Sequence, residues 1–451
     1  MTGRLPSLET LAGRLAGGTV SAATLLGLAL DRIDDPAGQG KPTFTRVNRA
    51  AASAAASASD ALRAAGVVAS PLAGLPISIK DLFDVAGEPT PAGSVALADA
   101  PPAARDAPIV ARLRAAGAVI IGRTNMTEFA FSGVGWNPHY GTPLNPYDRA
   151  TGRIPGGSSS GAAVSVTDAM AAAAIGTDTG GSVRIPAALC GLVGFKPTAR
   201  RVPREGCLPL SFSLDSIGPL APTVACCALV DSVLAGDPPA VPRALPIAGL
   251  RLLAPQSYVL DDMDAHVAGQ YERALARLGD AGARITFMTL ELLNQLPEIN
   301  AKGGLAGAEA YHWHRALLAS RGALYDPRVR VRIERGGALD AGDYIEVMRR
   351  RSEFQARLGA VMAGYDAVVM PTVPIIAPSL AEIADDSDFG RINLLLLRNP
   401  SICNFLDGCA LTVPCHDPGS APVGLMMMGG PLADHRILAI GRAVEALLRA
   451  V

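Results

Sequence analysis

Two glycine- and serine-rich segments, with one lysine upstream of them, carry the residue types that nucleophilic catalysis needs. The segments are Pro155–Gly161 and Gly176–Pro186; they contain Ser158 and Ser182, and the lysine is Lys80. A serine hydroxyl is a poor nucleophile until a base removes its proton. The set therefore offers a candidate nucleophile, a candidate base and backbone amides that could hold an oxyanion.

Lys80 could serve as the base only in its uncharged form. A solvated lysine has a pKa of about 10.4, and burial lowers that pKa because it disfavours the ammonium. Lys80 follows the strand-like run Leu75–Ile79, so its side chain could be buried. Taken alone, a surface lysine paired with Asp81 is the simpler interpretation.

Ser182 follows two glycines, Gly180 and Gly181. Successive amides in such a turn form an anion-binding nest, and each donor aimed at an oxyanion can lower the barrier by about 3 kcal/mol. An ordinary glycine turn before Pro186 is the alternative.

The spacing of the two serines predicts that they lie at one end of a sheet. Ser158 precedes Ser182 by 24 residues, which leaves room for a helix from Ser160 to about Ala171 and a strand over Ala172–Thr177. Ligands of α/β proteins bind at such an end. A flexible linker at Ser158 is disfavoured by these structured flanks.

Short apolar runs alternate with helical patterns along the chain, which predicts an α/β sheet covered by helices on both faces. The strand-like runs are Leu75–Ile79, Ala118–Ile121, Leu192–Phe195, Leu250–Leu253, Ile285–Met288, Ala367–Met370, Ala410–Val413 and Val423–Met428. Helix-like stretches are Ile109–Ala116, Val224–Leu234, His266–Leu278, Tyr344–Met362 and Leu432–Leu448, with an alanine-rich one over Ala50–Gly66 and another capped by Ser21. No repeat or linker divides this series, so we predict one domain over 1–451, with Gly236–Pro239 as a loop between its halves.

The composition excludes some classes of function. The 451 residues carry a formal net charge of −1, whereas a sequence-independent nucleic-acid binder needs a basic face. No apolar run approaches the roughly 20 residues of a membrane span, and no signal-peptide pattern opens the chain. The seven cysteines include no CxxC pair, which favours reduced thiols. We therefore expect a cytoplasmic protein that contacts neither membrane nor nucleic acid.

Taken together, six segments of the chain resemble the amidase signature family of hydrolases. They are Gly74–Asp81, Gly122–Phe129, Pro155–Gly161, Gly176–Pro186, Cys190–Thr198 and Ser213–Pro219. The match is dense over about 75–220 and looser beyond it. The resemblance implies one large domain with a central mixed sheet, a signature core over about 70–235, and a second half over about 236–451 that forms the variable substrate pocket.

The resemblance also implies the chemistry. Ser182 matches the nucleophile, Lys80 the base, and Ser158 the bridging serine, which follows a cis peptide bond from Gly157. The backbone amides of four residues match the oxyanion hole: Thr179, Gly180, Gly181 and Ser182. Asp178 and Arg184 match positions that brace this loop.

We therefore expect hydrolysis of a small-molecule carboxylic amide to an acid and ammonia or an amine, through an acyl-enzyme on Ser182. The family needs no metal or organic cofactor, and its members suggest a homodimer. Six aromatic or imidazole side chains are candidates for the acyl pocket, although core packing would explain each one as well: Phe131, Trp136, Tyr140, Tyr311, His312 and Phe405.

Three other interpretations stay open. The glutaminase subunit of a tRNA-dependent amidotransferase has the same triad, although its arginine- and tyrosine-rich segment is missing here. A binding module that kept the fold without catalysis is a second. The run Gly157–Gly161 also fits the G-x-S-x-G elbow of α/β-hydrolases, with Ser159 as nucleophile, but the residues before it read as a loop.

His312 and His314 could suggest a metal pair, yet on a helix residues two apart face different sides.

Overall fold

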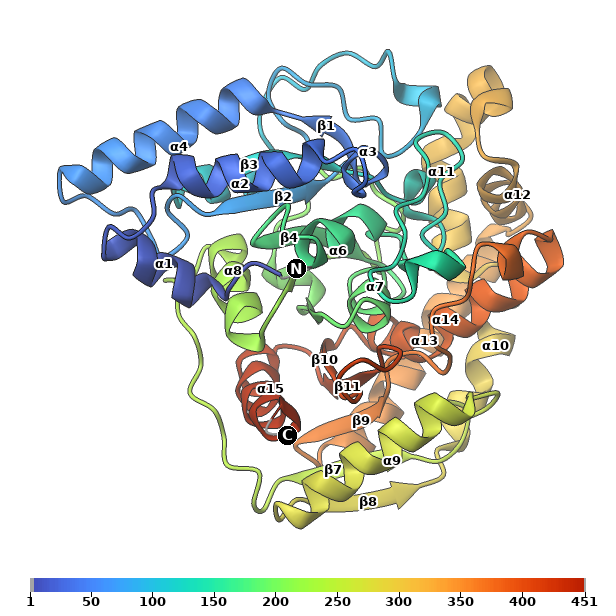
Figure 1. Ribbon diagram of the computed structural model, residues 1–451. Coiled ribbons are helices and arrows are strands. Elements are labelled where there is room, and N and C mark those ends of the chain that lie inside the picture. The colour runs from blue at the N-terminus through green and yellow to red at the C-terminus, as the bar shows by residue number, and fades with distance from the viewer. Residues whose placement is uncertain (1–3, 450–451) are drawn as a thin grey trace.

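The computed structural model describes residues 4–449, and its centre is one mixed sheet of eleven strands (Figure 1). The strands are β1 (Phe44–Val47), β2 (Pro76–Lys80), β3 (Val119–Thr124), β4 (Ala173–Asp178), β5 (Val193–Lys196), β6 (Ser216–Ala221), β7 (Arg251–Pro255), β8 (Arg284–Met288), β9 (Ala367–Pro371), β10 (Cys409–Pro414) and β11 (Gly424–Gly429). Their spatial order is β1-β3-β2-β4-β6-β5-β10-β11-β9-β7-β8. This arrangement confirms the predicted α/β class.

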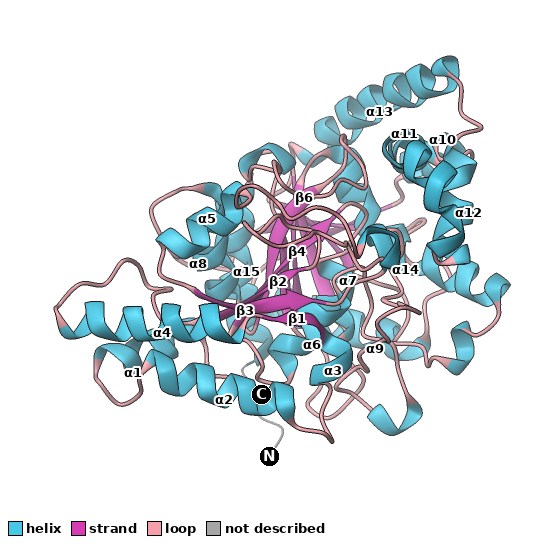
Figure 2. Cartoon of the chain, turned by 90° about the horizontal axis from the view of Figure 1, so that it is seen from above, coloured by secondary structure: helices cyan, strands magenta, loops and turns pink. Residues whose placement is uncertain are grey.

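Helices cover both faces of the sheet (Figures 1 and 2). They are α1 (Leu8–Ala16), α2 (Ala22–Asp34), α3 (Gly40–Thr43), α4 (Arg49–Ala64), α5 (Pro108–Ala115), α6 (Ser160–Thr167), α7 (Arg184–Leu189), α8 (Val224–Ala235), α9 (Ala265–Asp280), α10 (Leu296–Ile299), α11 (Gly304–Arg321), α12 (Pro327–Gly336), α13 (Ala341–Met362), α14 (Asp386–Leu406) and α15 (Asp434–Arg449). Helices α10 to α13 gather in one lobe beside the sheet (Figure 2). None of the helices within residues 4–449 is both long and apolar enough to cross a membrane.

Alternation along β2 decides which side of the sheet carries the lysine. Ile77 and Ile79 pack into the large core that also includes α5, α8 and α15. Successive side chains of a strand point to opposite faces, so Ser78 and Lys80 face the other way. The hydrogen bond between Ser78 Oγ and Ser165 Oγ (2.9 Å) shows that this other face is covered by α6.

The parallel pairing of β2 and β4 brings the two chemical segments to one edge of the sheet. Ile79 pairs with Ile175, so Lys80 at the end of β2 and Asp178 at the end of β4 lie at the same edge. Helix α6 ends at Thr167, earlier than the predicted Ala171, because Ala169 takes a left-handed conformation (φ 60°). The predicted placement of both serine loops at one end of the sheet is confirmed.

Two strands were not predicted. β1 has only four residues, of which two are polar, and β6 contains Gly218 and Pro219, which argue against a strand. Nevertheless β6 pairs with β4 on one side and β5 on the other, with Pro219 opposite Ile175. Tertiary pairing overrides local propensity here.

The two halves of the chain share the sheet. β5 belongs to the first half and pairs with β10 of the second, with Leu411 opposite Phe195. The segment after α8, which contains Gly236–Pro239, is a loop as predicted. It leads to β7 and does not separate two sheets.

Candidate active site

Lys80 is completely buried and contacts two hydroxyl groups. Its Nζ lies 2.7 Å from Ser158 Oγ and 2.8 Å from Thr177 Oγ1, and its exposed fraction is 0%. No carboxylate of residues 4–449 forms an ion pair with it. The alternative of a surface lysine paired with Asp81 is wrong, because Asp81 pairs with Arg123 instead (2.7 Å).

Burial changes the acid–base behaviour of this lysine. Desolvation lowers the pKa of Lys80 to about 7, and the more distant groups Cys207, Asp215 and Asp178 only partly oppose it. Near neutral pH the amine of Lys80 is therefore uncharged in a substantial fraction of the molecules. Such an amine can accept a proton from a neighbouring hydroxyl.

Ser158 lies in the turn that enters α6. The peptide bond between Gly157 and Ser158 is cis, and the Ser158 side chain is fully buried. Its carbonyl accepts a hydrogen bond from Thr127 N (3.1 Å), while Gly157 N donates to Gly133 O (2.8 Å). The turn is thus fixed from two sides by the segment 127–133.

Ser182 lies in the loop that follows β4, and its residue exposure is 3%. Ser159 N donates to Ser182 O (3.3 Å), which joins the two serine loops through their backbones. The Ser182 hydroxyl makes no hydrogen bond to any residue of 4–449, including Ser158. The structure therefore brings Lys80 and Ser158 into contact. Ser182 lies in the adjoining loop, but its hydroxyl is not hydrogen-bonded to Ser158.

The four predicted oxyanion amides do not all have the same surroundings. Gly181 N donates to Asp178 Oδ1 (2.9 Å). The N–H groups of Thr179, Gly180 and Ser182 have no hydrogen-bond acceptor within the described chain. Gly181 adopts φ +126°, a conformation that side chains rarely allow.

Asp178 and Arg184 form a buried ion pair, and Asp178 is hydrogen-bonded to the loop through Gly181 N. The Arg184 guanidinium donates to both carboxylate oxygens, from Nη2 (2.8 Å) and Nε (3.0 Å), and both side chains are fully buried. Burial alone would raise the pKa of Asp178, but the charge and hydrogen bonds of Arg184 lower it to about 2. The sequence resemblance placed both residues at loop-bracing positions; the ion pair between them is an observation of the structure.

Sequence reasoning missed Thr177, Asn404 and Asp215. Thr177 is the second partner of Lys80, and its position in the second glycine segment was the available signal. Asn404 Nδ2 donates to Asp178 Oδ1 (2.9 Å) from α14, more than two hundred residues later, and no local pattern indicates it. Asp215 Oδ1 accepts a hydrogen bond from Thr179 Oγ1 (2.5 Å).

The six pocket candidates divide into two groups. Phe131 and Trp136 are half-buried and flank the buried residues 132–135, which pack against the turn before Ser158. Tyr140 is half-buried near Asp81 and Glu128. The other three lie in or against the helical lobe.

Within that second group, Phe405 packs against Phe354 in a core (ring centroids 5.4 Å apart). Tyr311 packs against Gly337. His312 is exposed and contacts Phe212 edge-on.

The geometry does not favour the two rival motifs. Ser159 donates to the carbonyl of Thr177 (3.4 Å), not to a histidine. The residues before it form a loop with one 3-10 turn (Arg149–Thr151) and a bridge at Arg153, and not a strand. His312 is exposed whereas His314 is buried against Tyr325. No group of three potential ligands for a metal occurs within residues 4–449.

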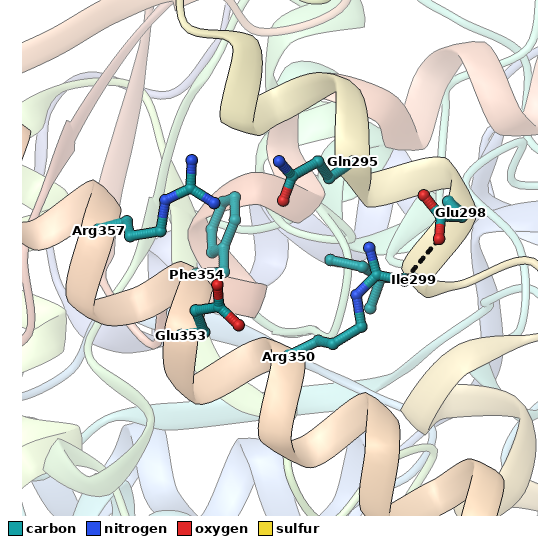
Figure 3. Close-up of a pocket in the computed structure, with 7 residues that line it drawn as sticks. All are labelled: Gln295, Glu298, Ile299, Arg350, Glu353, Phe354 and Arg357. Carbon is teal, nitrogen blue, oxygen red and sulfur yellow. Dashed lines mark hydrogen bonds and ion pairs between the residues drawn. The ribbon is translucent and has the colours of Figure 1, made fainter.

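A cavity of about 250 Å³ between α10 and α13 lies outside this site (Figure 3). Arg350 from α13 reaches across it to Glu298 (2.8 Å), and Phe354 forms part of its wall. Its lining contains none of the residues that surround Lys80.

Comparison with known proteins gives consistent matches over nearly the whole chain. A model of the family described as Amidase matches residues 27–438. The chain is 40% identical over 407 residues to 2-amino-5-chloromuconic acid deaminase of Comamonas testosteroni, covering 88% of this chain and 87% of that one. It is 35% identical over 469 residues to a glutamyl-tRNA(Gln) amidotransferase subunit of Chloroflexus aggregans, covering 96% and 94%. A solved structure described as an amidase superposes with a TM-score of 0.88 at 32% identity, covering 98% of this chain and 99% of its own.

Proposed function

The chain belongs to the amidase family, and from that membership we propose that it hydrolyses a small carboxylic amide through an acyl-enzyme on Ser182. The protein is a hydrolase of carbon–nitrogen bonds; the roles of individual residues are the proposal. One observation carries them: the buried Nζ of Lys80 lies 2.7 Å from Ser158 Oγ. An uncharged amine in contact with a serine hydroxyl is suited to accept the proton of that hydroxyl.

In the proposed reaction, neutral Lys80 takes the proton of Ser158 while Ser158 takes the proton of Ser182. Thr177 Oγ1, 2.8 Å from Nζ, accepts a hydrogen bond from the amine. This bond orients the lone pair of the Lys80 nitrogen toward Ser158. The step requires Ser182 Oγ to come within hydrogen-bond reach of Ser158 Oγ in the substrate complex, since catalytic hydrogen bonds often tighten only there. Ser182 Oγ then attacks the amide carbonyl.

The attack forms a tetrahedral intermediate with a negative oxygen. The N–H groups of Thr179, Gly180 and Ser182, which have no acceptor in the described chain, are the donors available to this oxygen. The proton held on Lys80 returns through Ser158 to the leaving nitrogen, and the C–N bond breaks. Water, deprotonated along the same path, then releases the acid and restores Ser182.

A screen for ammonia or amine release tests the proposal. The full-length protein is assayed with aliphatic, aromatic, amino-acid and dicarboxylic monoamides, with the Ser182→Ala variant as control. We expect turnover of at least one class, its loss in Ser182→Ala, and covalent labelling of Ser182 by a fluorophosphonate. Turnover that survives in Ser182→Ala, or no turnover and no labelling, contradicts the proposal and favours a binding module.

A second function is supported by one observation, the 35% identity to an amidotransferase subunit over 96% of the chain. In that case the substrate is glutamine and the ammonia passes to a partner protein. Glutaminase assays of the isolated chain, and then of the chain with candidate partners, separate the two functions. Activity on glutamine that appears only in a complex supports this second function.

A further inference from the structure

Glu309 in α11 holds a buried carboxyl group that accepts four hydrogen bonds. Its Oε1 accepts from Ser213 Oγ (2.5 Å) and Tyr344 OH (2.9 Å). Its Oε2 accepts from Ser211 Oγ (2.5 Å) and Ser213 N (2.9 Å). These bonds occupy the four lone-pair positions of an ionised carboxylate, and the exposed fraction of the residue is 6%.

The donors come from two parts of the molecule that are distant in sequence. Ser211 and Ser213 lie in the loop before β6, whereas Tyr344 lies in α13. No lysine or arginine within residues 4–449 forms an ion pair with Glu309, and all four of its hydrogen bonds come from neutral donors. Arg351 interacts with it through charge at longer range. One side chain thus joins the helical lobe to a loop of the first half.

That loop is hydrogen-bonded to the segment proposed to bind the oxyanion. Asp215 Oδ2 accepts hydrogen bonds from Leu210 N (3.0 Å) and Ser211 N (3.1 Å). Asp215 Oδ1 accepts from Thr179 Oγ1 (2.5 Å). An unbroken path of hydrogen bonds therefore runs from Glu309 through Ser211 and Asp215 to Thr179, the first residue of the loop that ends at Ser182.

We propose that Glu309 is a positioning residue, which sets the place of the loop 179–182 through Ser211 and Asp215. The proposal rests on the proposed role of that loop in oxyanion binding. Glu309 does not touch the reacting atoms; it fixes Ser211, whose backbone N–H fixes Asp215, whose carboxylate fixes Thr179. The helical lobe thereby contributes to the geometry of the site from outside it.

Kinetics of the Glu309→Gln variant test this role. Because donors aimed at an oxyanion act mainly in the transition state, we expect kcat to fall about ten-fold and KM to change less than about two-fold. Tyr344→Phe removes one of the four donors and keeps the rest, so we expect a smaller fall in kcat in the same direction. A folded Glu309→Gln variant with unchanged kcat, or with a change in KM alone, overturns the proposal.

Glu298→Gln, at a largely exposed glutamate of the same lobe, is the control. Glu298 also joins two helices of the lobe, through Arg350 (2.8 Å; Figure 3), but it has no hydrogen bond to the loop before β6. We expect wild-type kcat for this variant. An equal loss in Glu298→Gln and Glu309→Gln would indicate general loosening of the lobe and overturn the specific role.

A double-mutant cycle separates positioning from plain stabilisation. Thr179→Val removes the last hydroxyl of the path, so Glu309→Gln should have little further effect on kcat in that background. Losses that multiply would show that the two residues act independently and would contradict the proposal.

Hydrogen exchange tests the same path without turnover. The N–H groups of Gly181 and Val183 both donate to Asp178, and we expect them to exchange faster in Glu309→Gln, while those of α5 stay unchanged. If the wild type hydrolyses no amide, the proposed function fails and this measurement still decides the inference. Unchanged exchange at both positions counts against it.

Discussion

The amine of Lys80 lies 2.7 Å from the hydroxyl of Ser158 in a fully buried position, and the only other group of residues 4–449 bonded to it is the hydroxyl of Thr177. A buried ammonium would normally be paired with a carboxylate. Here the two contacts are neutral, so no adjacent carboxylate offsets the desolvation that lowers the pKa of the lysine. Burial without an adjacent counter-charge is what suits Lys80 to the proposed role of base.

Replacing Lys80 by methionine should abolish most of the activity. Methionine keeps the apolar stem and volume of the side chain and removes the proton acceptor. General-base catalysis typically contributes a factor of about 10²–10⁴, so kcat/KM should fall by that much on any amide that the wild type hydrolyses. Near-normal kinetics of Lys80→Met, with circular dichroism showing a folded protein, would show that another group is the base.

The pH dependence of kcat/KM should have an acid limb near pH 7. Desolvation lowers the pKa of Lys80 to about 7; below that pH the amine is protonated and cannot accept a proton, and above it the amine is free. The rate should therefore rise with pH through 7 and level off above it.

A second acidic group complicates this profile and provides its control. Burial raises the pKa of Asp215 to about 6, and protonation of Asp215 would disturb Thr179. The limb near 7 should vanish from the residual activity of Lys80→Met, whereas a limb near 6 should remain. A limb near 7 that persists in Lys80→Met would assign it to a different group.

Breaking the Asp178–Arg184 pair should destabilise the fold. Asp178→Asn leaves the fully buried guanidinium of Arg184 without its counter-charge, and such a loss typically costs about 3–5 kcal/mol. Chemical denaturation should report this as a lower free energy of unfolding. Glu346→Gln, which removes an exposed partner of Arg349, is the control and should leave the denaturation midpoint where it was. Equal midpoints for Asp178→Asn and the wild type would mean that the brace contributes nothing.

Two neighbouring glycines allow a matched test of the loop before Ser182. At Gly181 a Cβ would lie 2.6 Å from Pro400 Cβ, and φ is +126°; at Gly180 a Cβ would lie 3.3 Å from Leu397 Cδ2. Gly181→Ala should therefore displace the loop and reduce kcat severely, because strained backbone of this kind costs about 1–3 kcal/mol before the clash is counted. Gly180→Ala should have a clearly smaller effect. The reverse order would show that the loop is positioned differently during catalysis.

Site residues that lie in a recognisable local pattern could be predicted from the sequence, whereas partners without such a pattern could not. The end of β2, the end of β4 and the two glycine segments are local patterns, and they correctly placed Lys80 and Ser158 at one edge of a sheet. The strand β6 was missed because Gly218 and Pro219 speak against a strand, although pairing on both sides enforces one.

The wall of the site was the least predictable part. Asn404 contacts Asp178, and Glu309 contacts the loop before β6, both from helices of the second half. Nothing in their local sequence distinguishes them from ordinary helix residues. Phe405 is aromatic, as residues that line pockets often are, but it lies in a core beside Phe354. Aromatic character alone does not tell a wall from a core, because both require burial of a large apolar surface.

The pairing of β5 with β10 has a practical consequence for anyone who divides this chain. A fragment that ends near residue 235 would contain Lys80, Ser158 and Ser182, yet its β5 strand would present bare N–H and C=O groups where β10 normally lies. An open edge of that kind invites self-association. Chimaeras made by exchanging second halves between relatives therefore have to preserve the alignment of Leu411 with Phe195 as carefully as any reacting group.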